Sequence, residues 1–141
     1  MSMKKRVVKS PKVYFTDTGL ACYLARIKDS ETLLSSHFAG AFMETFVINK
    51  IRKSYLNNNQ DFNGYYYRDS LHWEIDLVMI ENGELTLIEV KKGVSFKLSD
   101  VSAFQQLSGS QYKIKDSCIL CNTEKNYPLK EDIFVMSVQC I

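Results

Sequence analysis

Alternating apolar and polar residues dominate the middle of the chain. Residues 73–80 and 85–92 each alternate, and the four residues between them include Asn82 and Gly83. An Asn-Gly pair between two alternating runs is typical of a tight β-hairpin, because both central residues of a type I′ turn need a positive φ. The pattern therefore predicts two antiparallel strands joined by a two-residue turn.

Further elements flank this hairpin. Helical spacing of apolar residues predicts a long helix over residues 38–56, and Asp17-Thr18-Gly19 can cap a shorter one over residues 20–27. A third helix, over residues 99–108, would be capped by its first serine and closed by Gly109. Strands are expected at residues 12–16, 64–68, 112–122 and 133–138. From residue 38 onward the predicted order is helix, three strands, helix, two strands.

The predicted turn determines which residues face one another across the hairpin. Counting outward from it, Asp76 lies opposite Glu89, and Glu74 lies opposite Lys91. Directly opposed side chains have Cβ atoms about 4.5–5.5 Å apart, and like charges placed there destabilise the pairing. A hard divalent cation such as Mg²⁺ would compensate two facing carboxylates. The alternative is a solvated sheet face, on which Glu74 and Lys91 form a minor surface ion pair.

Apolar neighbours favour a covered site over an open one. Side chains on a strand alternate between faces, so four apolar residues share the face predicted for Asp76 and Glu89. They are Val78, Ile80, Leu85 and Leu87. We expect the two carboxylates to lie at the edge of a buried surface, where their charges are less exposed to water.

The long helix contributes a third acidic candidate. Glu44 falls on one stripe with Ile48 and Ile51, at the spacing of a continuous helix face. A charge on a core-facing stripe must be paired, neutralised or bound to a cation, because burying it alone is costly. Glu44 is therefore either a further metal ligand or half of a salt bridge, for which Arg68 and Lys91 are the candidate partners.

Composition sets the class of protein. The 141 residues are 45% hydrophobic and 24% charged, which is typical of one globular domain. The net charge of +2 is too mild to indicate nucleic acid by itself, and the basic first twelve residues are interpreted as a solvated or interdomain segment. No apolar stretch approaches the ~20 residues of a membrane helix, and no signal peptide is recognisable, so we expect a cytoplasmic protein without membrane contact.

The four cysteines do not indicate a metal or redox site. In a cytoplasmic chain they are expected to be reduced. Cys118 and Cys121 have the spacing of a C-x-x-C motif, but they lie in a predicted strand, where residues three apart point to opposite faces. Core packing is the interpretation that this spacing favours.

The arrangement of charged residues resembles the PD-(D/E)XK nuclease superfamily. Glu44 lies on a helix, Asp76 on a strand, and Glu89-Val90-Lys91 on the next strand, before a further helix and strands. The resemblance covers residues 38–138 and implies an α/β fold, a restriction-endonuclease-like αβββαβ core with a mixed central sheet flanked by helices. Isoleucine stands before the aspartate, where the superfamily's name has proline, a residue that does no chemistry in the motif.

A narrower resemblance rests on residues 9–20, on Tyr67-Arg68 and on residues 88–93. Together they are similar to the uncharacterised domain found C-terminal to the ATPase in prokaryotic AAA-type ATP-binding proteins. This implies an upstream ATPase domain in a longer protein, since the chain has no phosphate-binding G-x-x-x-x-G-K-[ST] loop. The predicted division is an N-terminal extension, residues 1–36, and a nuclease-like domain, residues 37–141.

The resemblance also implies a mechanism. Asp76 and Glu89, with the Val90 carbonyl and Glu44, would hold Mg²⁺ or Mn²⁺, and Asp76, Glu89 and Lys91 would form the catalytic group. Lys91 would orient the attacking water or stabilise charge on the phosphoryl oxygens of a nucleic acid, expected to be DNA. The competing interpretation is a non-catalytic recognition or regulatory module of an ATPase, which binds nucleic acid or protein and keeps the acidic cluster as a salt-bridge network.

Overall fold

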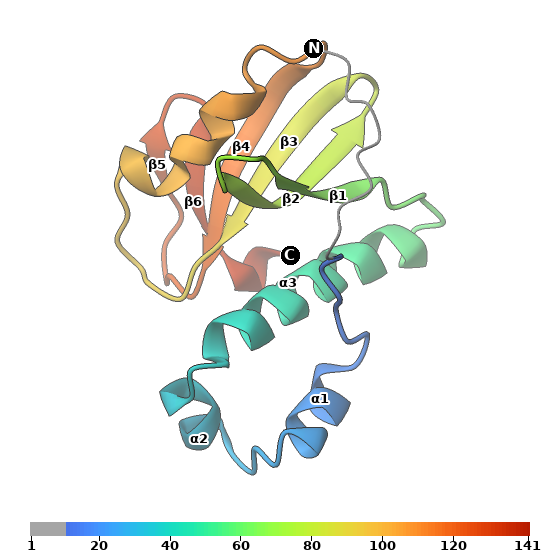
Figure 1. Cartoon of the computed structure of the whole chain (residues 1–141), viewed down its shortest axis with the longest axis vertical. Coiled ribbons are helices and arrows are strands. Elements are labelled where there is room, and N and C mark those ends of the chain that lie inside the picture. Colours follow the sequence, from blue (N-terminus) through green and yellow to red (C-terminus); the bar gives the residue numbers. More distant parts are fainter. Residues whose placement is uncertain (1–10) are drawn as a thin grey trace.

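A six-stranded mixed sheet, covered by helices on both faces, forms the body of the protein (Figure 1). The computed structural model describes residues 11–141. The strands are β1 (Gly64–Arg68), β2 (Glu74–Glu81), β3 (Glu84–Val90), β4 (Lys113–Cys121), β5 (Tyr127–Lys130) and β6 (Ile133–Ser137). The α-helices are α1 (Thr18–Leu24), α2 (Ser30–Ser35) and α3 (Ala39–Asn57), and the 3-10 helices are η1 (Leu98–Leu107) and η2 (Val138–Cys140).

The strand order confirms the predicted α/β class with a mixed central sheet. The strands lie in the order β1-β2-β3-β4-β6-β5. β3 pairs with β4 and β4 with β6 in parallel, whereas the other neighbours are antiparallel. α3, the three strands β1–β3, η1 and β4 follow one another as the αβββαβ order requires, with η1 in place of the second α-helix.

Two apolar cores lie on the two faces of the sheet. On one face, α3 buries Val47, Ile48 and Ile51 against Leu77 and Ile88 of the hairpin. On the other face, η1 buries four residues against Leu85 and Leu87 of β3. Those four residues are Val101, Ala103, Phe104 and Leu107. The hairpin is thus covered on both sides, and its end beyond the cores is where the candidate site lies.

The β2–β3 hairpin has the predicted turn and register. Asn82 and Gly83 have φ values of 50° and 81°, as the left-handed turn requires. Val78 pairs with Leu87, and the ladder continues toward the site as far as Leu77 opposite Ile88. The expected direct pairing of Asp76 with Glu89 and of Glu74 with Lys91 is absent from this described ladder, because the regular pairing of β2 with β3 ends one residue earlier.

A β-bulge in β2 explains this early end. Tyr65 pairs with Val78 and Tyr67 with Ile75, so that two residues of β2 lie opposite one residue of β1 between these pairs. The two residues are Asp76 and Leu77, and the single residue is Tyr66. A bulge bends and twists its strand and leaves one residue outside the ladder.

The bulge also reverses the alternation of faces. Ile75 and Val78 both pack in the core beneath η1, although residues three apart in a regular strand point to opposite faces. Leu77 packs instead in the core beneath α3. Asp76 therefore does not share the face of Val78 as predicted, and its carboxylate reaches the side of the sheet that carries Glu44.

Other segments differ from the predictions. Residues 12–16 form no strand, because they cross α3 and β2 and contact them through side chains. The third helix is a 3-10 helix that begins at Leu98, with a break in its φ/ψ angles at Val101. Its start is set by Asp100, whose carboxylate accepts a hydrogen bond of 2.7 Å from the Lys97 N–H.

Three elements were not predicted: α2, β5 and the short 3-10 helix η2, whose first residue, Val138, was assigned to the last strand. α2 is short and is capped by Asp29, whose carboxylate accepts a 2.7 Å hydrogen bond from Thr32. β5 contains Pro128, which disfavours a strand in sequence reasoning. It is tolerated because β5 is the last strand of the sheet, so its outer edge needs no hydrogen-bond donor.

Candidate active site

Asp76 lies at the end of the hairpin, where the bulge releases it from the ladder. Its Oδ2 accepts a 2.9 Å hydrogen bond from the N–H of Val90, which lies beyond the last residue of β3 that pairs with β2. Its Oδ1 lies 3.3 Å from the Lys12 ammonium. The side chain is only 12% exposed. Asp76 thus fixes the end of β3 with one oxygen and presents the other to a cation.

Glu44 projects from α3 toward the same cation. Its Oε1 lies 2.5 Å from Lys12 Nζ and accepts a 2.6 Å hydrogen bond from the Tyr14 hydroxyl. The salt bridge expected for Glu44 therefore exists, but its partner is neither of the residues predicted, Arg68 and Lys91. The reason is that residues 11–17 pack between α3 and β2 and bring their own lysine to the carboxylate.

Lys12 is the group that links Asp76 to Glu44. Its ammonium also lies over the Tyr66 ring, 4.7 Å from the centroid, in a cation–π contact. Burial lowers the pKa of Lys12, but Glu44 and then Asp76 outweigh burial, so the net pKa is raised above its ordinary value. Lys12 therefore keeps its proton, and its positive charge lies between two carboxylates.

Glu89 and Lys91 form a second ion pair on β3. Lys91 Nζ lies 2.7 Å from Glu89 Oε1, whereas Glu89 Oε2 is buried and has no hydrogen-bond partner among the described residues. Burial and then the charge of Asp76 raise the pKa of Glu89, although Lys91 opposes them. Burial lowers the pKa of Lys91, but Glu89 outweighs it and the net pKa is raised. One oxygen of a buried carboxylate is thus left without compensation.

Glu74 belongs to a different pair from the one predicted. Its carboxylate lies 3.1 Å from the Arg68 guanidinium, not beside Lys91. Arg68 is the direct partner of Glu74 in the β1–β2 register, whereas β3 has already separated from β2 at this point. Lys91 is consequently free to pair with Glu89 on its own strand.

The predicted site residues come together in two connected parts. Asp76 and Glu44 share Lys12, while Glu89 pairs with Lys91 and feels the charge of Asp76. Across residues 11–141, no three His, Cys, Asp or Glu side chains form a group that could hold a metal ion. The bulge moves Asp76 out of the regular ladder position opposite Glu89, so the two carboxylates are not directly paired.

Sequence reasoning missed several groups of the site. Lys12, Tyr14 and Tyr66 were not assigned to it, although Lys12 and Tyr14 lie within the N-terminal string that carried the narrower resemblance. Asn49 is buried in α3, and its amide donates a hydrogen bond to the Phe15 carbonyl. The sequence signal for this contact of Asn49 with Phe15 was a polar residue between Ile48 and Ile51, which both belong to the buried stripe of the helix.

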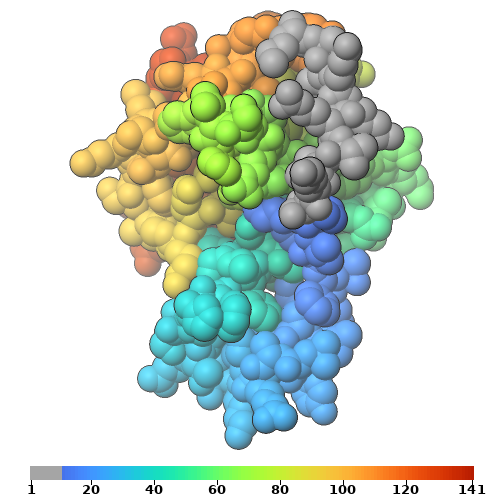
Figure 2. Space-filling model, viewed as in Figure 1, coloured from blue at the N-terminus to red at the C-terminus, as the bar shows by residue number. Residues whose placement is uncertain are grey.

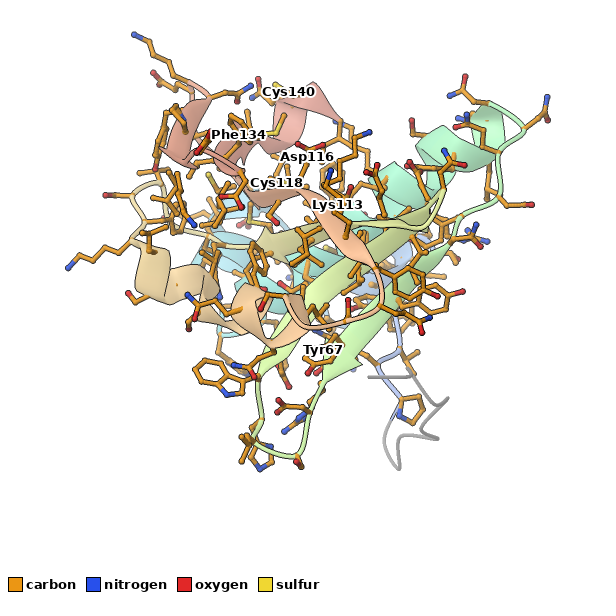
Figure 3. All side chains as sticks on the ribbon, turned by 90° about the horizontal axis from the view of Figure 1, so that it is seen from above. Tyr67, Lys113, Asp116, Cys118, Phe134 and Cys140 are labelled. Carbon is orange, nitrogen blue, oxygen red and sulfur yellow. The ribbon has the colours of Figure 1, made fainter. Side chains whose placement is uncertain are left out.

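The four cysteines are free. Cys121 lies in the core beneath η1, and Cys118 packs on the opposite face with the core beneath α3. Figure 3 shows Cys118 on the other side of the sheet from Tyr67, which packs beneath η1. Burial raises the pKa of the Cys118 thiol to about 12, so this thiol is a packing group.

Within the described part of the chain, no helix has the length and apolar character needed to cross a membrane. Four N-terminal basic residues lie outside the described residues, and only Lys12 of that run is placed. The four are Lys4, Lys5, Arg6 and Lys9.

Comparison with known families gives two matches. A model described as "Domain of unknown function (DUF4143)" matches residues 39–141, which include α3, the whole sheet and the site residues on them. A second model, "Domain of unknown function (DUF8612)", matches residues 1–31, which include Lys12 and α1. No curated protein and no solved structure matches the chain.

Proposed function

The chain belongs to the DUF4143 domain family, and we propose that it is a PD-(D/E)XK-like nuclease domain, C-terminal to the ATPase of a prokaryotic AAA-type ATP-binding protein. The reaction is metal-dependent hydrolysis of phosphodiester bonds in nucleic acid, with DNA as the expected substrate. The observation that carries the proposal is Glu89, a buried carboxylate with an unpartnered oxygen, beside Asp76 and Lys91 at the end of the hairpin.

The donor atoms here suit Mg²⁺ or Mn²⁺. Asp76 and Glu89 offer carboxylate oxygens, the Val90 carbonyl belongs to the residue between Glu89 and Lys91, and hard cations prefer all-oxygen sites. Oε2 of Glu89 is an acceptor without a donor among residues 11–141, as expected of a cation ligand. When bound, the cation would supply Lewis acidity that polarises the scissile phosphodiester and makes a water molecule more acidic. Glu44 can join these metal ligands only when the Lys12 ammonium has moved away from its carboxylate.

The chain's own residues orient the Asp76 carboxylate and supply positive charge to the substrate. The Val90 N–H holds Asp76 Oδ2, which fixes the direction of that carboxylate. Lys91 keeps its proton because Glu89 outweighs the effect of burial on its pKa. An ammonium is a compact point charge, so Lys91 can donate to phosphoryl oxygens as negative charge builds on them. The half-exposed position of Lys91 leaves it open to a substrate.

Cytoplasmic location is part of the proposal. Nucleic acid and ATP are both present there, and the free cysteines of the chain stay reduced in that compartment.

One observation favours the alternative function. Lys12 compensates both Asp76 and Glu44, so this half of the acidic cluster is satisfied as a salt-bridge network without any metal. Such a salt-bridge network is sufficient for a recognition or regulatory module of an ATPase. A module of this kind binds nucleic acid or protein without cutting it, so it requires no metal at these residues.

Calorimetry with Mn²⁺ and Mg²⁺ on the purified 141-residue chain separates the two functions. The nuclease proposal expects saturable binding that is lost in Asp76→Ala and in Glu89→Ala. Glu84→Ala is the matched control, because Glu84 is a carboxylate at the far end of β3, 4.0 Å from Lys113. No saturable heat at millimolar metal would favour the non-catalytic module.

Cleavage assays then test the chemistry. Single- and double-stranded DNA and RNA are incubated with Mn²⁺ or Mg²⁺, with and without excess EDTA. Lys91→Ala should abolish cutting, whereas Lys92→Ala should not, because the Lys92 ammonium is exposed and contacts only the Leu34 carbonyl, at 3.5 Å, among the described residues. Cutting that survives EDTA or Lys91→Ala would contradict the proposed mechanism.

A further inference from the structure

Lys12 occupies the place of a cation. Its ammonium lies 2.5 Å from Glu44 Oε1 and 3.3 Å from Asp76 Oδ1, and its side chain is 28% exposed. We propose that Lys12 is a built-in competitor for the divalent cation, and that the N-terminal segment, residues 11–17, must withdraw before the site is loaded. This inference rests on the proposed function for the identity of the site and adds the way in which it is regulated.

The competition follows from charge and space. Asp76 Oδ2 is already bound to the Val90 N–H, so Oδ1 is the oxygen left for a cation, and Lys12 holds it. Two cations within contact distance of one oxygen repel each other strongly when they are shielded from water. Divalent metal at Asp76 and the ammonium of Lys12 therefore exclude each other.

Lys12 compensates the site only in part. It supplies one positive charge to Asp76 and Glu44, and it leaves Oε2 of Glu89 without a partner. A divalent cation bound to Asp76 and Glu89 would satisfy that oxygen and would release Lys12 from Asp76. The two occupants thus define a closed arrangement, with Lys12 in place, and an open arrangement that accepts metal.

The N-terminal segment is held by its side chains, among them Tyr14, which packs against the core beneath α3. Within the described residues, no backbone–backbone hydrogen bond holds residues 11–16, and they belong to no strand or helix. Their anchors are side-chain contacts: Lys12 and Tyr14 on Glu44, and the Asn49 amide on the Phe15 carbonyl. Figure 2 shows this segment, in dark blue, on the surface where α3 meets the β1–β2 region.

The closed arrangement lowers the apparent metal affinity. When only a fraction of molecules is open, the apparent dissociation constant equals the intrinsic constant divided by that fraction. A segment that is open in about one molecule in ten therefore weakens metal binding about tenfold. Anything that binds the withdrawn segment, such as a neighbouring domain of a longer protein, would restore the affinity.

Lys12→Met is the first test. Methionine keeps an unbranched apolar side chain against Tyr66 and removes the ammonium. Calorimetry on the full chain, with folding checked by circular dichroism, should show Mn²⁺ bound about tenfold tighter than by the wild type. Lys92→Met is the matched control, because it removes an exposed lysine outside the site. It should leave the dissociation constant within about twofold.

Asn49→Leu is an independent second variant. It removes the anchor on Phe15 while every charge of the site stays, so it should also tighten Mn²⁺ binding. If Lys12→Met binds Mn²⁺ more tightly but Asn49→Leu does not, the proposed withdrawal of the segment is wrong. Removal of the Lys12 charge would then explain the tighter binding by itself.

The remaining outcomes separate the two proposals. If the wild type binds Mn²⁺ and Lys12→Met binds it equally or more weakly, the competition is wrong and the proposed metal site survives. If neither protein binds Mn²⁺, the proposed function and the competition both fall. Binding by Lys12→Met alone would support both, with the closed arrangement strongly favoured in the wild type.

Discussion

Replacing Glu89 by glutamine should raise the free energy of unfolding at neutral pH in metal-free buffer. Glu89 as a residue is 9% exposed, and its Oε2 has no partner within residues 11–141. Burial and the charge of Asp76 raise its pKa above the ordinary 4.5, so the folded state resists its ionisation. A neutral amide of the same shape avoids that cost.

The size of the effect follows from two opposing contributions. An unsatisfied buried polar group costs about 1–3 kcal/mol, and more when it is charged. Against this, glutamine weakens the contact with Lys91, a partly exposed pair worth up to about 1 kcal/mol. The net stabilisation is about 1 kcal/mol, which corresponds to about 3 °C in Tm for a domain of this length.

The sign changes with pH in a defined way. Below pH 4.5 Glu89 is protonated in both the folded and the unfolded state, so wild type and Glu89→Gln should be equally stable as far as this carboxyl is concerned. As the pH rises through 4.5 toward the raised pKa, the folded wild type holds a proton that the unfolded chain has lost, and its stability falls. The advantage of glutamine is complete above the raised pKa.

Urea unfolding at pH 4 and pH 7.5 in EDTA, followed by circular dichroism, measures this difference. Glu84→Gln is the control, because Glu84 lies on the same strand but is 36% exposed, and it should change stability by less than about 0.5 kcal/mol at both pH values. The reasoning would be refuted if Glu89→Gln were no more stable than wild type at pH 7.5, or if its advantage were equal at pH 4.

Three further predictions follow from the structure. Mn²⁺ at 100 times its dissociation constant should stabilise the wild type by about 2.7 kcal/mol and leave Glu89→Gln unchanged in thermal unfolding. Gly83→Ala should lower the free energy of unfolding by about 1 kcal/mol, because φ is 81° there, whereas Gly109→Ala, with open space around its Cβ and no positive φ, should cost nothing in the same urea titration. Iodoacetamide at pH 8, read by mass spectrometry, should modify the exposed Cys140 and spare Cys118 of the folded chain, whose pKa of about 12 keeps it a thiol.

Each of these three predictions would be contradicted by a specific outcome. Equal metal stabilisation of wild type and Glu89→Gln would remove Glu89 from the ligand set. Equal losses at Gly83 and Gly109 would mean that the hairpin turn is not under conformational constraint. Modification of Cys118 at the rate of Cys140 would show that the sheet face beneath α3 opens readily.

Local patterns were sufficient for the regular elements. β1 begins and ends at the predicted residues 64 and 68, and α3 and the β2–β3 hairpin lie within a residue or two of their predicted bounds. These segments combine a clear period with turn or cap residues that agree with it. The α/β class with a mixed sheet, which the superfamily resemblance implied, is confirmed by the strand order. By contrast, residues 12–16 and η1 were misassigned, because an extended run needs a neighbouring strand and a short helix is shaped by its contacts.

The candidate site shows where sequence reasoning stops. The chain by itself determined which residues carry charge near the end of the hairpin, since Asp76, Glu89 and Lys91 are placed there by period and turn. Only the tertiary structure decided how they face one another. The bulge arises from pairing of β2 with β1, and Lys12 reaches Glu44 and Asp76 from more than thirty residues away in sequence. Such contacts depend on packing between distant segments, which no local period encodes.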